Sequence, residues 1–141
     1  MDLGETNLSA LLRSLHPVLH DESFVFGTLK SARAIQEGLL HPIATIQEAE
    51  GLSVILTQAE ADNHRVPYHG VFRRITLEVH SSLTSVGLTA AISTRLAAHD
   101  IPANIVAGTF HDHVFVPESV GEETMVHLRA LSTEASSLLR D

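Results

Sequence analysis

Residues 74–117 have the sequence RITLEVHSSLTSVGLTAAISTRLAAHDIPANIVAGTFHDHVFVP, and this stretch decides the fold. Its first part, Arg74–His80, alternates polar and apolar side chains, which predicts a strand with one buried face. Residues 86–99 are rich in helix formers. Apolar side chains recur there at every fourth position and form one stripe: Leu88, Ile92 and Leu96. This spacing predicts an amphipathic helix directly after the strand.

The remainder of the stretch predicts a hairpin. Pro102 ends the helix, because the residue before a proline is driven away from helical backbone angles. Residues 104–110 are dense in β-branched side chains and predict a second strand. A turn at His111–His113 leads from it into a third strand at residues 114–117. A last amphipathic helix follows. The order β-α-β-β-α predicts a split βαβ, ferredoxin-like sheet with both helices on one face.

The first half of the chain predicts a degenerate copy of this unit. The pattern indicates a short helix at residues 7–15, a connector at 16–20, a strand at 23–29, two strands meeting at Gly51, and a helix at 58–64. Residues 66–70 predict a linker, because Pro67 and Gly70 interrupt both periodicities. We therefore expect an α+β fold of two βαββαβ-type subdomains, at residues 1–70 and 71–141. The first is degenerate, and both have antiparallel sheets with helices on one face.

The composition and charge of the chain exclude several classes of function. The 141 residues are 44% apolar, which suffices for a shared hydrophobic core. The formal net charge is −8, and no cluster of lysines and arginines offsets it, so we expect neither nucleic acid nor membrane as a partner. The absence of cysteine excludes disulfides, thiolate catalysis and Cys-ligated metals. The sequence contains no basic leader followed by an apolar run, and we expect a cytoplasmic protein.

Four segments carry a resemblance to a known family. They are Leu12–Pro17, Ala44–Leu52, Ile75–Ala91 and Asn104–Pro117. Through them the chain resembles the small bacterial stand-alone tandem ACT-domain proteins, a largely uncharacterised group. The resemblance implies regulatory modules that bind amino acids or other small ligands, usually at an interface between two domains. No catalytic domain is fused to them here.

The bend before the predicted helix is the candidate ligand site. A helix N-terminus presents unpaired N–H groups and a partial positive charge, which can hold a carboxylate, and Gly87 would allow close approach of a ligand. The resemblance adds the strand 104–107 as the opposite wall, where the Asn104 amide can both donate and accept. The predicted ligand-binding residues are Ser81, Ser82, Leu83, Ser85, Val86, Gly87, Leu88, Asn104, Ile105, Val106 and Ala107. In the alternative, one serine caps the helix and the others face solvent.

The histidines offer a metal-binding alternative. In the predicted topology the strand that ends at His80 and the hairpin meet at one edge of the sheet, so His80, His111, Asp112 and His113 could converge. Neutral imidazoles and a carboxylate suit zinc or another divalent ion. Short His-x-His spacing is nevertheless far less specific than an established metal-binding signature.

The sequence thus predicts a sensor that binds a small molecule, for which we expect an amino acid, without a cofactor and as a homodimer. We expect no enzyme, because the chain has neither a nucleophile elbow nor a Gly-rich phosphate loop. Two alternatives remain open: a structural or protein-interaction module without a ligand, and a His-ligated metal protein.

Overall fold

The structure is a computed structural model that describes residues 7–79 and 81–137. The described residues fall into two compact units. Unit 1 takes its residues from the segments up to His20 and from Arg73 onward, and unit 2 is Asp21–Phe72. Unit 2 is therefore inserted in the sequence of unit 1. The division into domains 1–70 and 71–141 stays a prediction.

Unit 2 consists of a short sheet and two small helices. Its elements are most of β1 (Pro17–Leu29), α2 (Arg33–Gln36), β2 (Ala44–Glu48), β3 (Gly51–Thr57) and α3 (Gln58–Asn63). The strands lie in the order β2-β3-β1, and β2 and β3 form the predicted hairpin at Gly51. The core includes Val25, Val54 and Leu56, against which the single turn of α2 packs through Ile35. This turn is the degenerate counterpart of the long helix in the second half.

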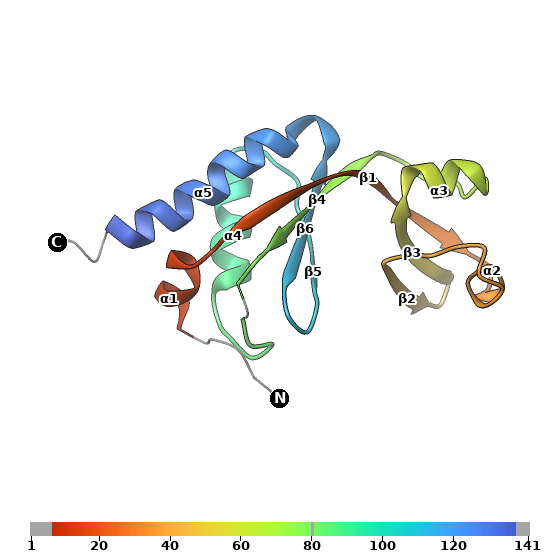
Figure 1. The fold of residues 1–141 in the computed structure, drawn as a ribbon, viewed down its shortest axis with the longest axis horizontal. Coiled ribbons are helices and arrows are strands. Elements are labelled where there is room, and N and C mark those ends of the chain that lie inside the picture. The colour runs from red at the N-terminus through yellow and green to blue at the C-terminus, as the bar shows by residue number, and fades with distance from the viewer. Residues whose placement is uncertain (1–6, 80, 138–141) are drawn as a thin grey trace. The chain divides into compact units, whose positions relative to one another are not determined.

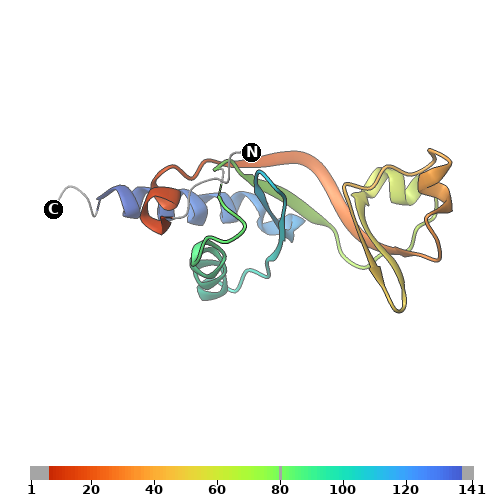
Figure 2. The ribbon, with the colours of Figure 1, turned by 90° about the horizontal axis from the view of Figure 1, so that it is seen from below.

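Unit 1 contains the rest of the chain's regular structure. Its elements are α1 (Leu8–Arg13), the first residues of β1, β4 (Phe72–Leu77), α4 (Leu88–Ala98), β5 (Asn104–Ala107), β6 (Asp112–Pro117), η1 (Glu118–Val120) and α5 (Gly121–Ser137). The strands lie in the order β1-β4-β6-β5 (Figures 1 and 2). This is the predicted α+β, ferredoxin-like arrangement, because the strand pair joined through α4 has β6 inserted between its members.

The core of unit 1 lies between the sheet and its helices. The predicted stripe of Leu88, Ile92 and Leu96 is buried there, together with Ile75 and Leu77 of β4. Helix α1 joins this core, packs against α4 and α5 (Figure 1), and buries its Leu11 completely. These contacts place the N-terminal helix in the same packing unit as the C-terminal helix.

Several strand boundaries differ from the sequence-based expectation. Strand β1 already begins at Pro17, so residues 17–20 are strand and not a connector. Strand β5 ends at Ala107, and a turn closed by a 2.8 Å hydrogen bond from the Gly108 N–H to the His111 carbonyl follows it. Asp112 therefore belongs to β6 and pairs with Ala107, while His113 pairs with Val106.

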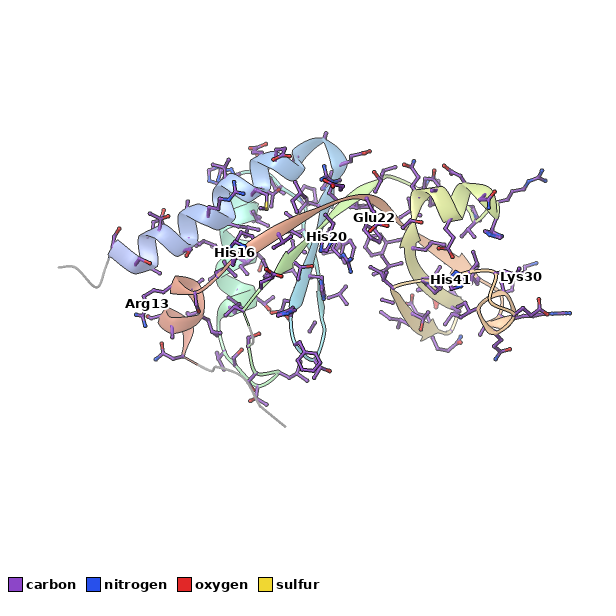
Figure 3. The ribbon with its side chains drawn as sticks, viewed as in Figure 1. Arg13, His16, His20, Glu22, Lys30 and His41 are labelled. Carbon is purple, nitrogen blue, oxygen red and sulfur yellow. The ribbon has the colours of Figure 1, made fainter. Side chains whose placement is uncertain are left out.

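The sheet face of unit 1 opposite the helices carries a polar network. Thr76 is 7% exposed, and its Oγ1 lies 2.7 Å from Nε2 of His20 and 3.0 Å from Nδ1 of His113. The three residues come from β1, β4 and β6, and Figure 3 labels His20 on β1. Burial lowers the pKa of His113, and the positive charges of Arg74, His111 and His20 lower it further.

Within the described residues, no helix is both long and apolar enough to cross a membrane.

Candidate functional site

A pocket of about 130 Å³ lies where the Ser-rich bend meets the start of α4 and the β5–β6 hairpin. All of its walls belong to unit 1. The lining residues are Ser81, Ser82, Leu83, Ser85, Gly87, Leu88, Thr89, Ala107 and Asp112. The pocket is thus built largely from the bend that the sequence singles out, from one residue of β5 and from one of β6.

Two hydroxyl groups of the bend, those of Ser82 and Thr84, bond to each other, and neither caps the helix that follows. The Ser82 Oγ accepts a hydrogen bond from the Thr84 backbone N–H at 3.2 Å and lies 2.9 Å from the Thr84 hydroxyl. The residue at the N-cap of α4 is Gly87, and no side chain in the described part of the chain caps this helix. The alternative in which a serine caps α4 is therefore wrong. The first-turn N–H groups, at the positive end of the helix dipole, lie at the pocket without a side-chain acceptor.

Gly87 lines the pocket and also has a structural role in the packing of α1. Its φ of 104° lies in the left-handed region, and a Cβ added there would lie 3.0 Å from Cδ2 of Leu8 in α1. The space that glycine leaves free is occupied by this leucine. Gly87 therefore allows the chain to turn into α4 and allows Leu8 of α1 to pack against its backbone, because no other residue combines that φ with so small a volume.

Asp112 is the ionisable residue among the described residues of the pocket, and the sequence predicts it as a candidate metal ligand and not as a ligand-binding residue. Its side chain is partly buried, and this loss of water raises the pKa of the carboxyl, against the opposing effect of the positive charge of His111. Among the described residues, no side chain or backbone group forms a hydrogen bond or ion pair with this carboxylate. A desolvated carboxylate without a partner is unfavourable in itself and is typical of functional sites.

The structure places the predicted ligand-binding residues in two groups. Most of the bend lines the pocket, as does Ala107. Val86 does not line it, and its side chain is 82% exposed. Asn104, Ile105 and Val106 also lie off the pocket, because β5 runs toward it and residues along a strand are about 3.3 Å apart. Only the last residue of β5 reaches the site.

The residues of the metal-binding alternative are not brought together within the described part of the chain. Successive strand residues point to opposite faces, so Asp112 lines the pocket while His113 turns to Thr76 on the other side of the sheet. His80 lies outside the described residues. Over residues 7–79 and 81–137, no three His, Asp or Glu side chains lie close enough to hold a metal ion.

Comparison with known families agrees with this architecture. Models of the ACT domain match the chain twice, at residues 3–73 and 72–129. The chain belongs to the ACT domain family. It is a tandem ACT protein, as its residues suggest. ACT domains are regulatory modules that bind small molecules, and this chain consists of two of them.

Solved structures share the fold of this tandem ACT protein. A Vibrio cholerae protein of unknown function, described as a possible transport protein, is 39% identical. The match covers 89% of this chain and 95% of that one, with a TM-score of 0.79. A protein from Agrobacterium tumefaciens is 16% identical, with 84% and 89% coverage and a TM-score of 0.67. The ligand-free regulatory subunit of aspartate kinase from Thermus thermophilus is 10% identical, with 85% and 97% coverage and a TM-score of 0.65. No curated protein matches by sequence.

Proposed function

We propose that this tandem ACT protein is a sensor that binds an amino acid in the pocket of unit 1. The observation that carries the proposal is the coincidence of an uncapped start of α4 with a polar pocket in a protein of this family. A sensor of this kind performs no chemistry of its own. It signals because the ligand stabilises one arrangement of the protein over another.

The size and polarity of the pocket suit a small metabolite. Its volume of about 130 Å³ is well below the roughly 300–1,000 Å³ typical of pockets for drug-sized ligands. The N–H groups at the first turn of α4 are oriented for a carboxylate, and the hydroxyls of Ser81, Ser82 and Ser85 add donors and acceptors. The ligand's carboxylate would bind at the helix end.

A second copy of the chain is the partner that we propose for this pocket. Exposed apolar side chains occur in the two segments that form it: Leu83 is 71% exposed, Val86 82% and Phe110 62%. Covering these side chains would remove apolar surface from water and close the pocket over its ligand. Ligand binding and dimer formation would then reinforce each other, because each would stabilise the same closed arrangement.

Thermal unfolding of chelator-treated protein against the twenty amino acids tests the proposal. A ligand that binds only the folded protein raises stability by RT ln(1 + [L]/Kd), or about 4 kcal/mol at a thousandfold excess over Kd. We expect a selective rise in the melting temperature with one amino acid or a small group. Zinc, nickel and manganese belong in the same panel, since a rise with a metal alone would favour the metal protein instead.

A pair of variants locates the site. Ala107→Leu adds bulk directly to the pocket wall and should abolish the rise. Ala97→Leu makes the same change at an exposed position of α4 outside the pocket and should leave the rise intact. An unchanged rise in Ala107→Leu would place the binding site elsewhere. No rise with any amino acid in the wild-type protein would remove the sensor proposal and favour an interaction module.

A further inference from the structure

We propose that Asp112 determines which class of ligand the pocket accepts, by forming an ion pair with a protonated amine next to the ligand's carboxylate. This assignment rests on the proposed function, because it concerns the same pocket. It adds a specificity-determining residue that sequence patterns place outside the site. It also predicts which close analogues of an amino acid the protein rejects.

The state of the Asp112 carboxylate supports this assignment. Asp112 has lost part of its water to burial, yet among the described residues no hydrogen bond or ion pair compensates for that loss. Desolvated charges in folded proteins are usually paired, because an isolated one is unfavourable. The positive charge of His111 acts on Asp112 and lowers the pKa of its carboxyl, but the two side chains form no ion pair. The natural place for the missing cation is the pocket that Asp112 lines.

The chemistry of the other pocket walls also supports a cationic partner for Asp112. Among the described residues that line the pocket, Asp112 is the one ionisable residue, and the others are serines, a threonine, glycine and apolar residues. At neutral pH this wall is negative. A ligand with a carboxylate and no cationic group would therefore meet repulsion from Asp112. A ligand that carries an ammonium group next to its carboxylate can form an ion pair with this wall. One small molecule could then contact both the start of α4 and Asp112.

The strand that carries Asp112 holds this residue firmly in place. Asp112 pairs with Ala107 across the β5–β6 ladder, and it lies two residues before Val114, which is completely buried in the core of unit 1. A side chain on a paired strand beside the core is placed more reproducibly than one on an exposed loop. The β6 strand thus fixes the charged group relative to the start of α4, which bounds the same pocket.

The selectivity that follows is specific. The pocket should accept a 2-amino acid and reject the corresponding 2-hydroxy acid, which has the same carboxylate and side chain but no cation. Hydrogen bonds to charged groups contribute about 1.5–3 kcal/mol, or roughly 10- to 150-fold in affinity. The protein would therefore report the amino acid without responding to its deaminated relatives.

The test is isothermal titration of three proteins with two probes. The probes are the amino acid that gives the largest thermal shift in the wild-type protein and its 2-hydroxy acid. The proteins are the wild type, Asp112→Asn and Asp100→Asn. Asp100 is exposed, lies outside the pocket and has a φ of 56°, which asparagine tolerates, so its variant matches the chemical change in unit 1 without touching the site.

We expect the wild type and Asp100→Asn to prefer the amino acid at least about tenfold over the hydroxy acid, and Asp112→Asn to bind both alike. Cooperative thermal unfolding of each variant shows that it is folded. Equal binding of the amino acid by Asp112→Asn and the wild type would overturn the assignment while leaving the sensor intact. Equal binding of the hydroxy acid and the amino acid by the wild type would do the same. Absence of any amino-acid binding to the wild type would instead remove the proposed function itself.

Discussion

The Nδ1 atom of His113 lies 3.0 Å from the Oγ1 atom of Thr76, and that same hydroxyl lies 2.7 Å from Nε2 of His20. A hydroxyl group has one hydrogen. Between two neutral imidazoles it can donate to one nitrogen and accept from the other, so the two rings take complementary tautomers. This bridge ties three neighbouring strands, β1, β4 and β6, on the sheet face away from the helices.

Removal of the bridging hydroxyl should destabilise unit 1. Thr76→Val keeps the shape of the side chain but leaves the His113 Nδ1 without this partner in a partly buried site. We expect a loss of about 1–2 kcal/mol in the free energy of unfolding, measured by urea denaturation. Thr76→Ser retains the hydroxyl and is the matched control. A Thr76→Val variant as stable as Thr76→Ser would contradict a stabilising role for the hydroxyl.

Stability should fall as the solution becomes mildly acidic. Burial, followed by the charges of Arg74, His111 and His20, makes the pKa of His113 lower in the folded protein than in the unfolded chain. The unfolded chain therefore binds the proton first. The contribution of His113 is complete above its unfolded pKa of about 6.5 and is lost as the pH falls toward the folded pKa, with a slope below about 1.4 kcal/mol per pH unit.

The measurement that checks this pH dependence is urea denaturation at pH 7.5 and pH 5.5. The wild type should lose more stability between these pH values than His113→Gln does. His64→Gln, which changes an exposed histidine after α3, should behave like the wild type. Identical pH dependence in the wild type and His113→Gln would show that His113 does not contribute.

Asp112→Asn should make the ligand-free protein more stable. Burial raises the pKa of this carboxyl in the folded state, so the folded protein disfavours the charge that the unfolded chain accepts freely. The penalty is absent below the unfolded pKa of about 3.9 and grows as the pH rises through the folded pKa. At pH 7 we expect the variant to melt about 1–3 °C higher, since solvent reaches part of the group. At pH 3 the difference should vanish, and a lower melting temperature at pH 7 would contradict this account.

Asp112 illustrates the usual conflict between stability and function, because removing its charge should stabilise the protein although we propose that this charge recognises the ligand. The negative charge that lowers the stability of the ligand-free protein is the charge with which the ligand's amine would pair.

Gly87→Ala should be more destabilising than Gly38→Ala. Both glycines have positive φ, at 104° and 75°, so both substitutions strain the backbone. Only at Gly87 would the added Cβ also crowd a neighbour, Leu8, whereas nothing lies within 4 Å at Gly38. We expect a loss of about 1 kcal/mol at Gly38 and about 2–3 kcal/mol at Gly87, measured by urea denaturation. Equal losses would indicate that Leu8 moves aside freely.

The sequence predicts the bend and α4 well because their signals are local. The fourfold spacing of Leu88, Ile92 and Leu96 and the cluster of serines before Gly87 need no knowledge of distant residues. The pocket beside them follows from the ferredoxin-like order, in which the strand that follows α4 returns to the same edge of the sheet.

Asp112 was misplaced because the expected strand began two residues too late, at Val114. Counting back from Val116 and Val114 at the strand period of two places Asp112 on their face, which is the signal that could have found it. The Thr76 bridge could not be predicted in the same way. The alternation at Arg74–Leu77 places Thr76 on the outer face, but its histidine partners come from strands that lie 56 and 37 residues away in the sequence.

The central claim is that the pocket at the start of α4 is a ligand site. Amide chemical shifts recorded by NMR during titration with the amino acid that gives the largest thermal shift test this claim most directly. The account predicts saturable shifts concentrated at Ser81–Thr89, Ala107 and Asp112, with little change at the His20–Thr76–His113 bridge on the opposite face. Shifts that cluster in unit 2, or an unchanged spectrum at millimolar ligand, would contradict it.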